Sequence, residues 1–242
     1  MPAIEISIDV LPEQSLSTIL DNEVIVLDSE TTGLYPHLSP ECDEYGPDRI
    51  CSLSAILLKR TSSGGWEPVS QRTSRFNPER PINSYAAKVN HFFWSEGEED
   101  TPSGYQNLRP ERIFAEKLTA ILEYIGPRLI VAHNASFDMA FLDAELARAG
   151  IEPLLGNFAC TRAAFAERVG LGRNHPRAYG TKLDDLCSAY GIPRGARSCG
   201  HGAAVDAGLC AEGFAYLDYD GLMLAEAMEN LPHRSHQDSL AP

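Results

Sequence analysis

The chain has 242 residues, 43% of them hydrophobic, and a formal net charge of −14. This length suffices for one large domain with a sizeable core, and no stretch approaches the roughly 18 consecutive apolar residues of a membrane-spanning helix. The acidic balance argues against tight, non-specific binding of duplex nucleic acid through a basic surface. From the length we expect a single domain over residues 1–242. The six cysteines form no Cys-x-x-Cys pair and we find no secretory signal, so we expect free thiols and a cytoplasmic protein.

The first predicted strand covers residues 24–27, four apolar residues of which three are β-branched. Asp28 and Glu30 follow it directly. Residues i and i+2 of an extended chain point to the same face, so both carboxylates aim at one place. Two such charges repel each other, and a hard cation such as Mg²⁺ removes that cost. On these residues alone, a strand that ends in a turn with two solvated acids explains the pattern equally well.

Residues 35–48 are rich in Pro, Asp and Glu and predict a loop beside these carboxylates. We favour a solvated surface loop, and the alternative is a lid or a negatively charged wall. Residues 49–58 and 66–76 predict the second and third strands, joined by a Gly-containing turn, and hence an antiparallel meander.

A second acidic loop is predicted at 94–108, followed by alternating helices and short strands. Helices are expected at 110–125, 135–149, 161–169, 182–190, 202–217 and 222–231, and strands at 129–132 and 157–160. Asp138 lies near the start of the helix that follows the first of these strands. His201 precedes Asp206 by five residues, at the start of the helix predicted from residue 202.

Three segments now form a pattern: Asp-x-Glu-Thr-Thr-Gly at 28–33, His-Asn-Ala-x-Phe-Asp at 133–138 and His-x4-Asp at 201–206. In kind and order they resemble the motifs of the DEDDh subgroup of DnaQ-like 3′→5′ exonucleases, which includes proofreading subunits, ribonuclease T and oligoribonuclease-like enzymes. The resemblance covers about residues 23–217. It implies the ribonuclease-H-like α/β fold, with a mixed five-stranded sheet of an antiparallel meander plus parallel strands, flanked by helices.

The resemblance also implies a catalytic site with two divalent cations, Mg²⁺ or Mn²⁺. The implied metal ligands are Asp28, Glu30, Asp138 and Asp206. Asp28 would bridge both ions, Glu30 and Asp206 would complete one site, and Asp138 would hold the other ion directly or through water. His201 would be the general base, since an unperturbed pKa of about 6.5 suits proton abstraction at neutral pH. The implied reaction is hydrolysis of single-stranded DNA or RNA from the 3′ end to nucleoside 5′-monophosphates.

Candidate substrate contacts lie in four segments. They are Thr31, Gly33, Leu34, Asn90, His91, Phe92, Asn134, Phe137, Arg173 and Arg177. Residues 89–92 match a Val-His-Gly-Ile-like segment of the family only in part, with Asn90 at the usual histidine place. Phe92 could stack on a base or pack beneath the loop, and we favour packing. His133 is expected to shape its loop rather than to catalyse.

Charge is distributed unevenly along the chain. Residues 160–200 hold seven Lys or Arg and three Asp or Glu, a local charge of +4, whereas the rest of the chain carries −18. Arg173 and Arg177 lie in this basic segment, which leads to His201. A noncatalytic nucleic-acid-binding or polymerase-accessory subunit on the same fold is the alternative function, and a second copy of the chain or a polymerase is a candidate partner. No membrane partner is expected.

Overall fold

The computed structural model describes residues 22–37, 44–97, 100–152, 158–172, 181–195 and 202–219. The elements along the chain are β1 (Glu23–Thr31), β2 (Ile50–Arg60), β3 (Trp66–Arg75), α2 (Ser84–Asn90), β4 (Phe92–Phe93), β5 (Gln106–Asn107), α3 (Phe114–Ile125), β6 (Leu129–Ala132), α4 (Ala135–Arg148), β7 (Phe158–Cys160), α5 (Thr161–Arg168), α6 (Leu183–Tyr190) and α7 (Ala203–Tyr219). Within these ranges, no helix combines the length and the apolar character needed to cross a membrane.

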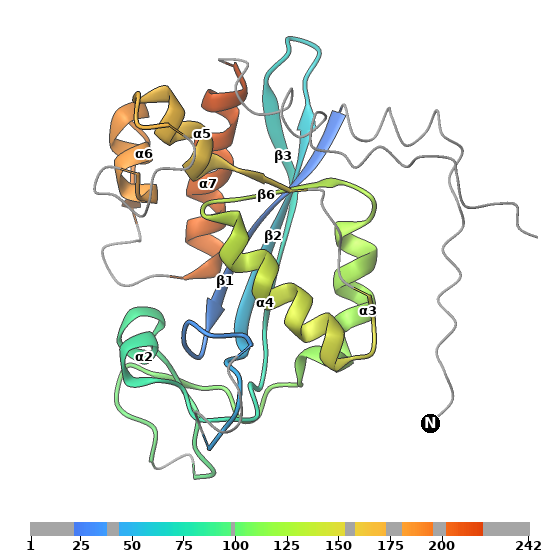
Figure 1. Ribbon diagram of the computed structural model, residues 1–242, viewed down its shortest axis with the longest axis vertical. Coiled ribbons are helices and arrows are strands. Elements are labelled where there is room, and N and C mark those ends of the chain that lie inside the picture. Colours follow the sequence, from blue (N-terminus) through green and yellow to red (C-terminus); the bar gives the residue numbers. More distant parts are fainter. Residues whose placement is uncertain are drawn as a thin grey trace, which may run out of the picture.

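One five-stranded sheet, in the order β3-β2-β1-β6-β7, organises the molecule (Figure 1). β1 pairs antiparallel with β2 and parallel with β6, while β2–β3 is antiparallel and β6–β7 is parallel. The predicted mixed sheet, a meander followed by parallel strands, is therefore confirmed. β4 and β5 form a separate two-stranded sheet.

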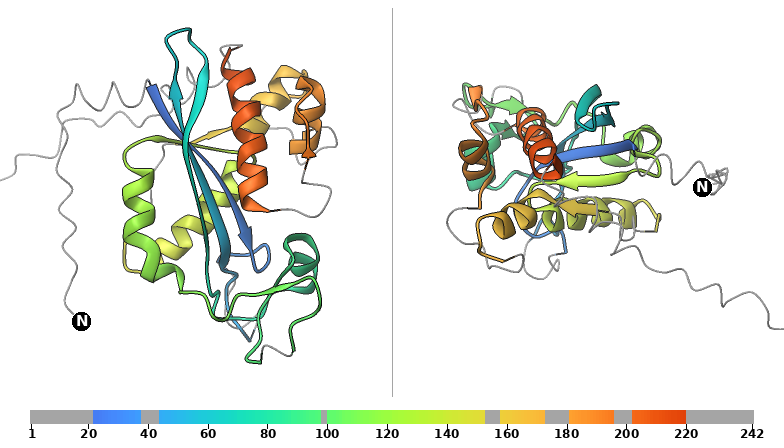
Figure 2. Two further views of the ribbon diagram at one scale, coloured as in Figure 1. Left: turned by 180° about the vertical axis from the view of Figure 1, so that it is seen from behind. Right: turned by 90° about the horizontal axis from the view of Figure 1, so that it is seen from above.

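Helices cover both faces of the sheet, and the alternation of side chains along β1 divides the core between them (Figure 2). Val24 and Val26 pack with residues of α5, α6 and α7. Ile25 and Leu27 point the other way and pack with residues of α3 and α4. Because both faces are covered, β1 is a run of fully buried apolar residues rather than an alternating one.

The far end of β1 carries an irregularity beside the first predicted motif. The β1–β2 register runs from Glu23↔Lys59 to Glu30↔Ser52 and then shifts, so that Thr31 lies opposite Ile50. The extra residue in β2, Cys51, makes this a β-bulge, a feature that bends the local backbone and re-aims its side chains.

The elements differ from the predicted ones at two places. Helix α2 was not predicted, and the helix expected from residue 110 begins at Phe114. In α7, Tyr216 is 48% exposed and stacks on Tyr190, with ring centroids 5.1 Å apart. The predicted helix at 222–231 lies outside the described residues.

Candidate active site

Three carboxylates meet at the end of β1. Asp28 and Glu30 share the face of Val24 and Val26, which is the face that α7 covers. Asp206 lies in the first turn of α7. One oxygen from each of the three side chains lies within 4.8 Å of the others, and Asp206 is buried. The strand period and the start of the helix therefore bring together residues that are 176 positions apart, 30 to 206.

This group has the composition of a site for a hard cation. Three carboxylates at such separations repel one another unless a proton or a cation neutralises them. Carboxylate oxygens are the donors that Mg²⁺ and Mn²⁺ prefer, and the group offers three of them at one point. The donor set thus fits the divalent ions that the sequence predicts.

Asp138 is held beside β1 by Ser29. It lies in the first turn of α4, and its Oδ1 accepts hydrogen bonds from the backbone N–H of Ser29 at 3.0 Å and from Ser29 Oγ at 2.7 Å. Burial raises the pKa of Asp138 to about 7, and the two hydrogen bonds from Ser29 act in the opposite direction. Ser29 stands between Asp28 and Glu30, so the fourth carboxylate is tied to the same three-residue stretch without joining the group of three.

The turn after β1 presents an apolar side chain to solvent. Thr31 Oγ1 donates to the carbonyl oxygen of Gly33 at 2.6 Å, and Leu34 is 54% exposed. Asn90, at the end of α2, donates from Nδ2 to the carbonyl oxygen of Thr31 at 3.2 Å, while its Oδ1 accepts from the backbone N–H of Phe92. The amide of Asn90 therefore joins α2 to the turn.

Two neighbours of Asn90 differ in their surroundings. His91 is exposed, has a positive φ of 59° and stacks on Tyr105, with ring centroids 5.6 Å apart. Phe92 is buried with Cys51 and Leu108. Of the two interpretations of Phe92, the structure favours packing over stacking on a base.

The second motif forms a tightly bonded corner before α4. Asn134 has a φ of 72°, and its Oδ1 accepts from Arg162 Nη1 at 3.1 Å. The His133 ring bonds to Thr161 Oγ1 at 3.0 Å and to the carbonyl oxygen of Thr181 at 3.1 Å. These contacts agree with the shaping role predicted for His133. Phe137 packs on Phe141, with ring centroids 4.9 Å apart.

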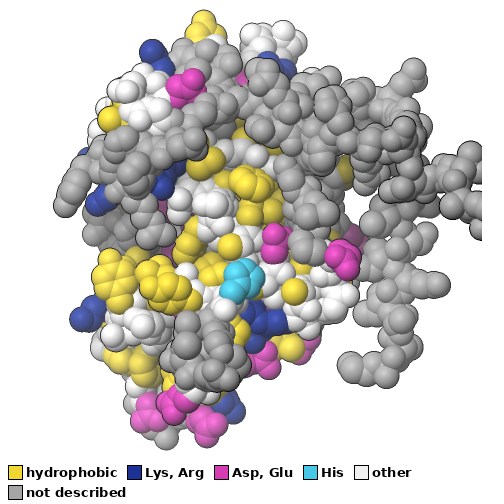
Figure 3. Space-filling view, in the orientation of Figure 1, with side chains coloured by type: hydrophobic (Ala, Val, Ile, Leu, Met, Phe, Trp, Pro, Cys, Tyr) yellow, Lys and Arg dark blue, Asp and Glu magenta, His cyan; other side chains and the backbone are white. Residues whose placement is uncertain are grey.

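Three predicted site residues, His201, Arg173 and Arg177, lie outside the described residues. Among the described side chains on the face drawn in Figure 3, Lys and Arg are dispersed between acidic and apolar groups and form no broad basic patch.

Comparisons with known proteins identify the family. A model described as Exonuclease, for the RNase T family, matches residues 25–214. The chain belongs to this exonuclease family. DNA polymerase III subunit epsilon of Salmonella typhimurium is 28% identical over 225 residues, which cover 93% of this chain and 82% of that protein. The same subunit of Treponema pallidum is 30% identical over 191 residues, covering 77% and 72%. The predicted relation to DnaQ-like 3′→5′ exonucleases is confirmed.

Solved structures of other exonucleases share the fold. The nuclease domain of 3′hExo, a DEDDh family member bound to rAMP, superposes with a TM-score of 0.59 at 13% identity and covers 83% of this chain and 93% of that one. Exonuclease X in complex with 5′ overhanging duplex DNA gives 0.51 at 18% identity, covering 84% and 99%. These similarities confirm the ribonuclease-H-like fold of this chain.

The sequence reasoning missed residues that support the exonuclease motifs. Asp48 was placed in a solvated loop, yet it is only 5% exposed and accepts a hydrogen bond from Thr32 Oγ1 at 2.8 Å. Glu145 of α4 is 2% exposed. One signal for Glu145 was available, because it lies between Leu142 and Leu146 on a predicted helix and a carboxylate among core positions calls for a buried partner. No comparable signal marked Asp48 among the acids of its loop.

Proposed function

We propose that this chain is a metal-dependent exonuclease of DEDDh type that hydrolyses single-stranded nucleic acid from the 3′ end and releases nucleoside 5′-monophosphates. The observation that carries this proposal is the group formed by Asp28, Glu30 and Asp206, within 4.8 Å of one another, in a chain of the exonuclease family. The three acids come from the first and third motifs.

The carboxylates would hold the cations. Asp28, Glu30 and Asp206 would hold the divalent cations at the point where their oxygens meet, and Asp138 would assist from its place beside Ser29. Bound divalent cations supply positive charge for the scissile phosphate and for the leaving oxygen. The two hydrogen bonds from Ser29 orient the carboxylate of Asp138.

His201 would act as the general base. A neutral imidazole accepts the proton of the attacking water, and an unperturbed pKa of about 6.5 leaves most of it neutral at pH 7. Thr31, Gly33 and Leu34 would contact the terminal nucleotide from the turn beside the acids. Asn90, His91, Asn134 and Phe137 would line the same region.

A second candidate function is supported by the names of the relatives, which are subunits of DNA polymerase III. The chain would then belong to a polymerase complex, either as a proofreading exonuclease or as a noncatalytic accessory subunit. The intact set of acids supports the catalytic form. Nothing among the candidate contacts distinguishes DNA from RNA by the 2′-hydroxyl.

The test is a side-by-side digestion of single-stranded DNA and RNA oligonucleotides labelled at the 5′ end, with Mg²⁺, Mn²⁺ or EDTA. We expect a ladder of labelled products that shortens progressively with either metal and no digestion in EDTA. Early appearance of the label in a mononucleotide would contradict the 3′→5′ direction. Absence of metal-dependent digestion, together with binding to the strands, would favour the accessory function.

A further inference from the structure

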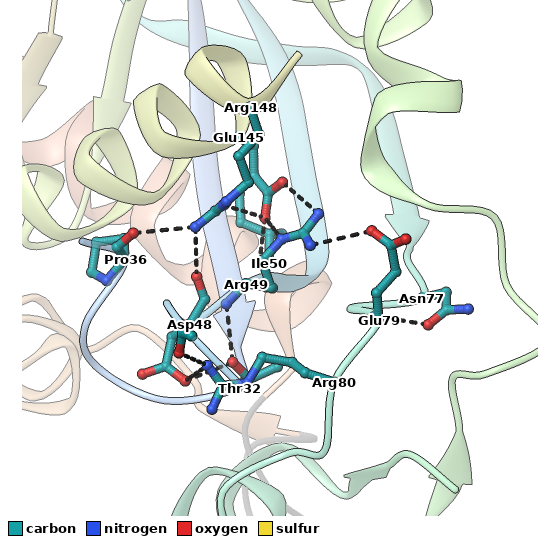
Figure 4. A network of polar contacts seen from close by, with 11 residues as sticks. Thr32, Pro36, Asp48, Arg49, Ile50, Asn77, Glu79, Arg80, Glu145 and Arg148 are labelled. Carbon is teal, nitrogen blue, oxygen red and sulfur yellow. Dashed lines mark hydrogen bonds and ion pairs between the residues drawn. The ribbon is translucent and has the colours of Figure 1, made fainter. Parts of the chain in front are cut away.

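The carboxylate of Asp48 clasps the turn that follows β1 (Figure 4). Its Oδ1 accepts from Thr32 Oγ1 at 2.8 Å, and its Oδ2 accepts from the backbone N–H of Tyr35 at 3.0 Å. The backbone N–H of Asp48 donates to the carbonyl oxygen of Tyr35 at 3.0 Å. A Cβ at position 33 would collide with this carboxylate, so the carboxylate can occupy this place only because residue 33 is glycine. We call these contacts the Asp48 clasp.

A buried arginine balances the charge of the clasp. Arg80 is 6% exposed, and its Nη1 lies 3.4 Å from Asp48 Oδ1 and also donates to the carbonyl oxygen of Gly46. Arg80 belongs to the segment that leads into α2. In that segment the backbone N–H of Asn83 donates to the carbonyl oxygen of Thr32 at 2.9 Å. The clasp therefore fixes the turn, the start of β2 and the approach to α2 together.

A second buried carboxylate anchors the clasp to α4. Glu145 accepts from Arg49 through Nε at 2.8 Å and Nη2 at 3.0 Å, and from the backbone N–H of Ile50 at 3.2 Å. Arg148 bonds to Glu145 at 3.1 Å and donates to the carbonyl oxygen of Asp48 at 3.3 Å. Glu145 follows Asp138 by seven residues, about two helical turns, so both carboxylates lie on one side of α4.

The Asp48 clasp holds the backbone of the turn from the buried side, and the turn exposes large side chains to solvent. Leu34 and Tyr35 expose 54% and 61% of their surface, while Thr32 beneath them is fully buried. A surface turn held in one backbone conformation by buried, charge-assisted hydrogen bonds loses little conformational entropy when it binds a ligand. We propose that Asp48 is a positioning residue, which sets the backbone of residues 32–35 so that Gly33 and Leu34 receive the 3′-terminal nucleoside. This inference rests on the proposed function, and it assigns Asp48 no part in metal binding or proton transfer.

The test variant is Asp48→Asn, which keeps the size of the side chain. An amide has a single acceptor oxygen, so it loses one of the two bonds to Thr32 and Tyr35 and turns an N–H₂ toward a donor. We expect KM for a single-stranded oligonucleotide to rise about tenfold and kcat to stay within about twofold, since uniform binding is lost and the chemistry is retained. Amide hydrogen exchange of residues 33–35 should accelerate, and the Kd for the oligonucleotide in Ca²⁺ should rise in parallel with KM.

Asp218→Asn is the matched control. Asp218 is also a buried carboxylate, and its Oδ2 accepts from Arg60 Nη2 and from Trp66 Nε1, both at 2.8 Å. These partners lie at the end of β2 remote from the turn, because Arg60 and Trp66 flank the β2–β3 hairpin. This variant should lose stability without a rise in KM. A second pair tests the clasp itself: Thr32→Val removes the hydroxyl at nearly constant volume and should raise KM, and Thr32→Ser keeps the hydroxyl and should return KM toward the wild-type value.

Equal KM values and equal amide exchange in wild type and Asp48→Asn would overturn the proposal. So would a fall in kcat at unchanged KM, because the effect would then fall on the chemical step. The outcome for the proposed function is separate. A wild-type chain that binds 3′ ends in Ca²⁺ but does not cleave them in Mn²⁺ would contradict the exonuclease activity alone, and the ratio of Kd values would still decide the role of Asp48. A wild-type chain that binds no 3′ end would contradict both.

Discussion

At the scale of residues, three consecutive positions of β1 divide the candidate site between two helices. Asp28 and Glu30 face α7 and meet Asp206, while Ser29 between them faces α4 and holds Asp138. Because side chains alternate along a strand, these three consecutive residues contact two different helices. Asp28 and Glu30 meet Asp206 at one point, and Ser29 holds the fourth acid, Asp138.

The first prediction concerns the charge of this group. Asp28→Asn should abolish hydrolysis and leave the metal-free protein as stable as wild type or more stable by up to about 1 kcal/mol, because one member of a repelling group becomes neutral. Thermal melts with and without Mn²⁺ measure this, since Mn²⁺ should raise Tm of the wild type and have little effect on the variant. Asp218→Asn provides the contrast, because its carboxylate has an arginine partner and its loss should lower Tm. Retained hydrolysis by Asp28→Asn would disprove the assignment.

The second prediction concerns the general base. His201→Ala should lower kcat by about 10²–10⁴-fold, the usual contribution of proton abstraction by a positioned side chain. Mn²⁺ affinity measured by calorimetry should not change, because His201 is proposed to take a proton and not to bind metal. If the variant loses Mn²⁺ binding, the histidine is a ligand and the proposed role is wrong.

The residues that could be predicted are those whose partners are close in sequence or whose spacing carries chemistry. Asp28 and Glu30 share a face by strand geometry alone, and the family motifs pointed to Asp206. Asp48 and Glu145 escaped notice because their burial depends on contacts with Tyr35, Arg49 and Arg80, which only the folded chain brings together. The sequence alone therefore does not distinguish a solvated acid of the 35–48 loop from the buried Asp48.

At the scale of elements, α7 approaches its neighbours closely because it is built from small residues. Gly213 lies where a Cβ would come within 2.5 Å of the Leu186 side chain of α6. The same helix carries Asp206 in its first turn and packs against β1 and β2. The packing of α6 on α7 thus helps to hold a candidate metal ligand in place.

The third prediction tests this packing with two glycines of one helix. Gly213→Ala should destabilise the protein by about 1–3 kcal/mol, the usual cost of overpacking a core. Gly208→Ala is the matched control, because nothing lies within 4 Å of its added Cβ, and helix propensity should make it neutral or stabilising by up to about 1 kcal/mol. Urea unfolding of both variants measures the difference. Equal stabilities would contradict the close contact between α6 and α7.

Elements long enough to repeat their apolar pattern several times were predictable, and short elements were not. The strands of the meander and α4 agree with their predicted ranges within a few residues. Helix α2 has only seven residues and begins at an Asn83 cap, whose side chain accepts from the backbone N–H of Tyr85. Two turns carry too little periodicity to be recognised. The start of α3 was predicted at residue 110, four residues before Phe114, because a proline at position 110 suits the first turn of a helix.

At the scale of the whole molecule, the question is how a chain of net charge −14 holds a polyanion. Several described arginines are already bonded to acids, among them Arg49 with Glu145, Arg60 with Asp218 and Arg128 with Glu23. Metal ions and a small number of cationic side chains would then provide the contacts to phosphate.

The fourth prediction assigns part of this binding to Arg173 and Arg177, in the basic segment that leads to His201. Binding of a single strand in Ca²⁺ should depend weakly on salt, with a log–log slope of about −0.7 per phosphate contact. Replacing both arginines by Ala should flatten this slope by about one to two contacts and leave kcat at saturating substrate nearly unchanged. The measurement is the affinity for a single strand in Ca²⁺ at a series of salt concentrations, for the wild type and for the double variant. Identical slopes and affinities would mean that these arginines do not contact the strand.

The central claim, metal-dependent removal of nucleotides from a 3′ end, is tested most directly by the first product released. The substrate is a single strand labelled in the base of its 3′-terminal nucleotide, incubated with Mn²⁺ and with either wild-type protein or Asp28→Asn. We predict that the wild type releases the labelled nucleoside 5′-monophosphate before any other product, that the variant releases none, and that EDTA stops the reaction. Release of the label in a longer oligonucleotide, or as a nucleoside 3′-monophosphate, would contradict the account.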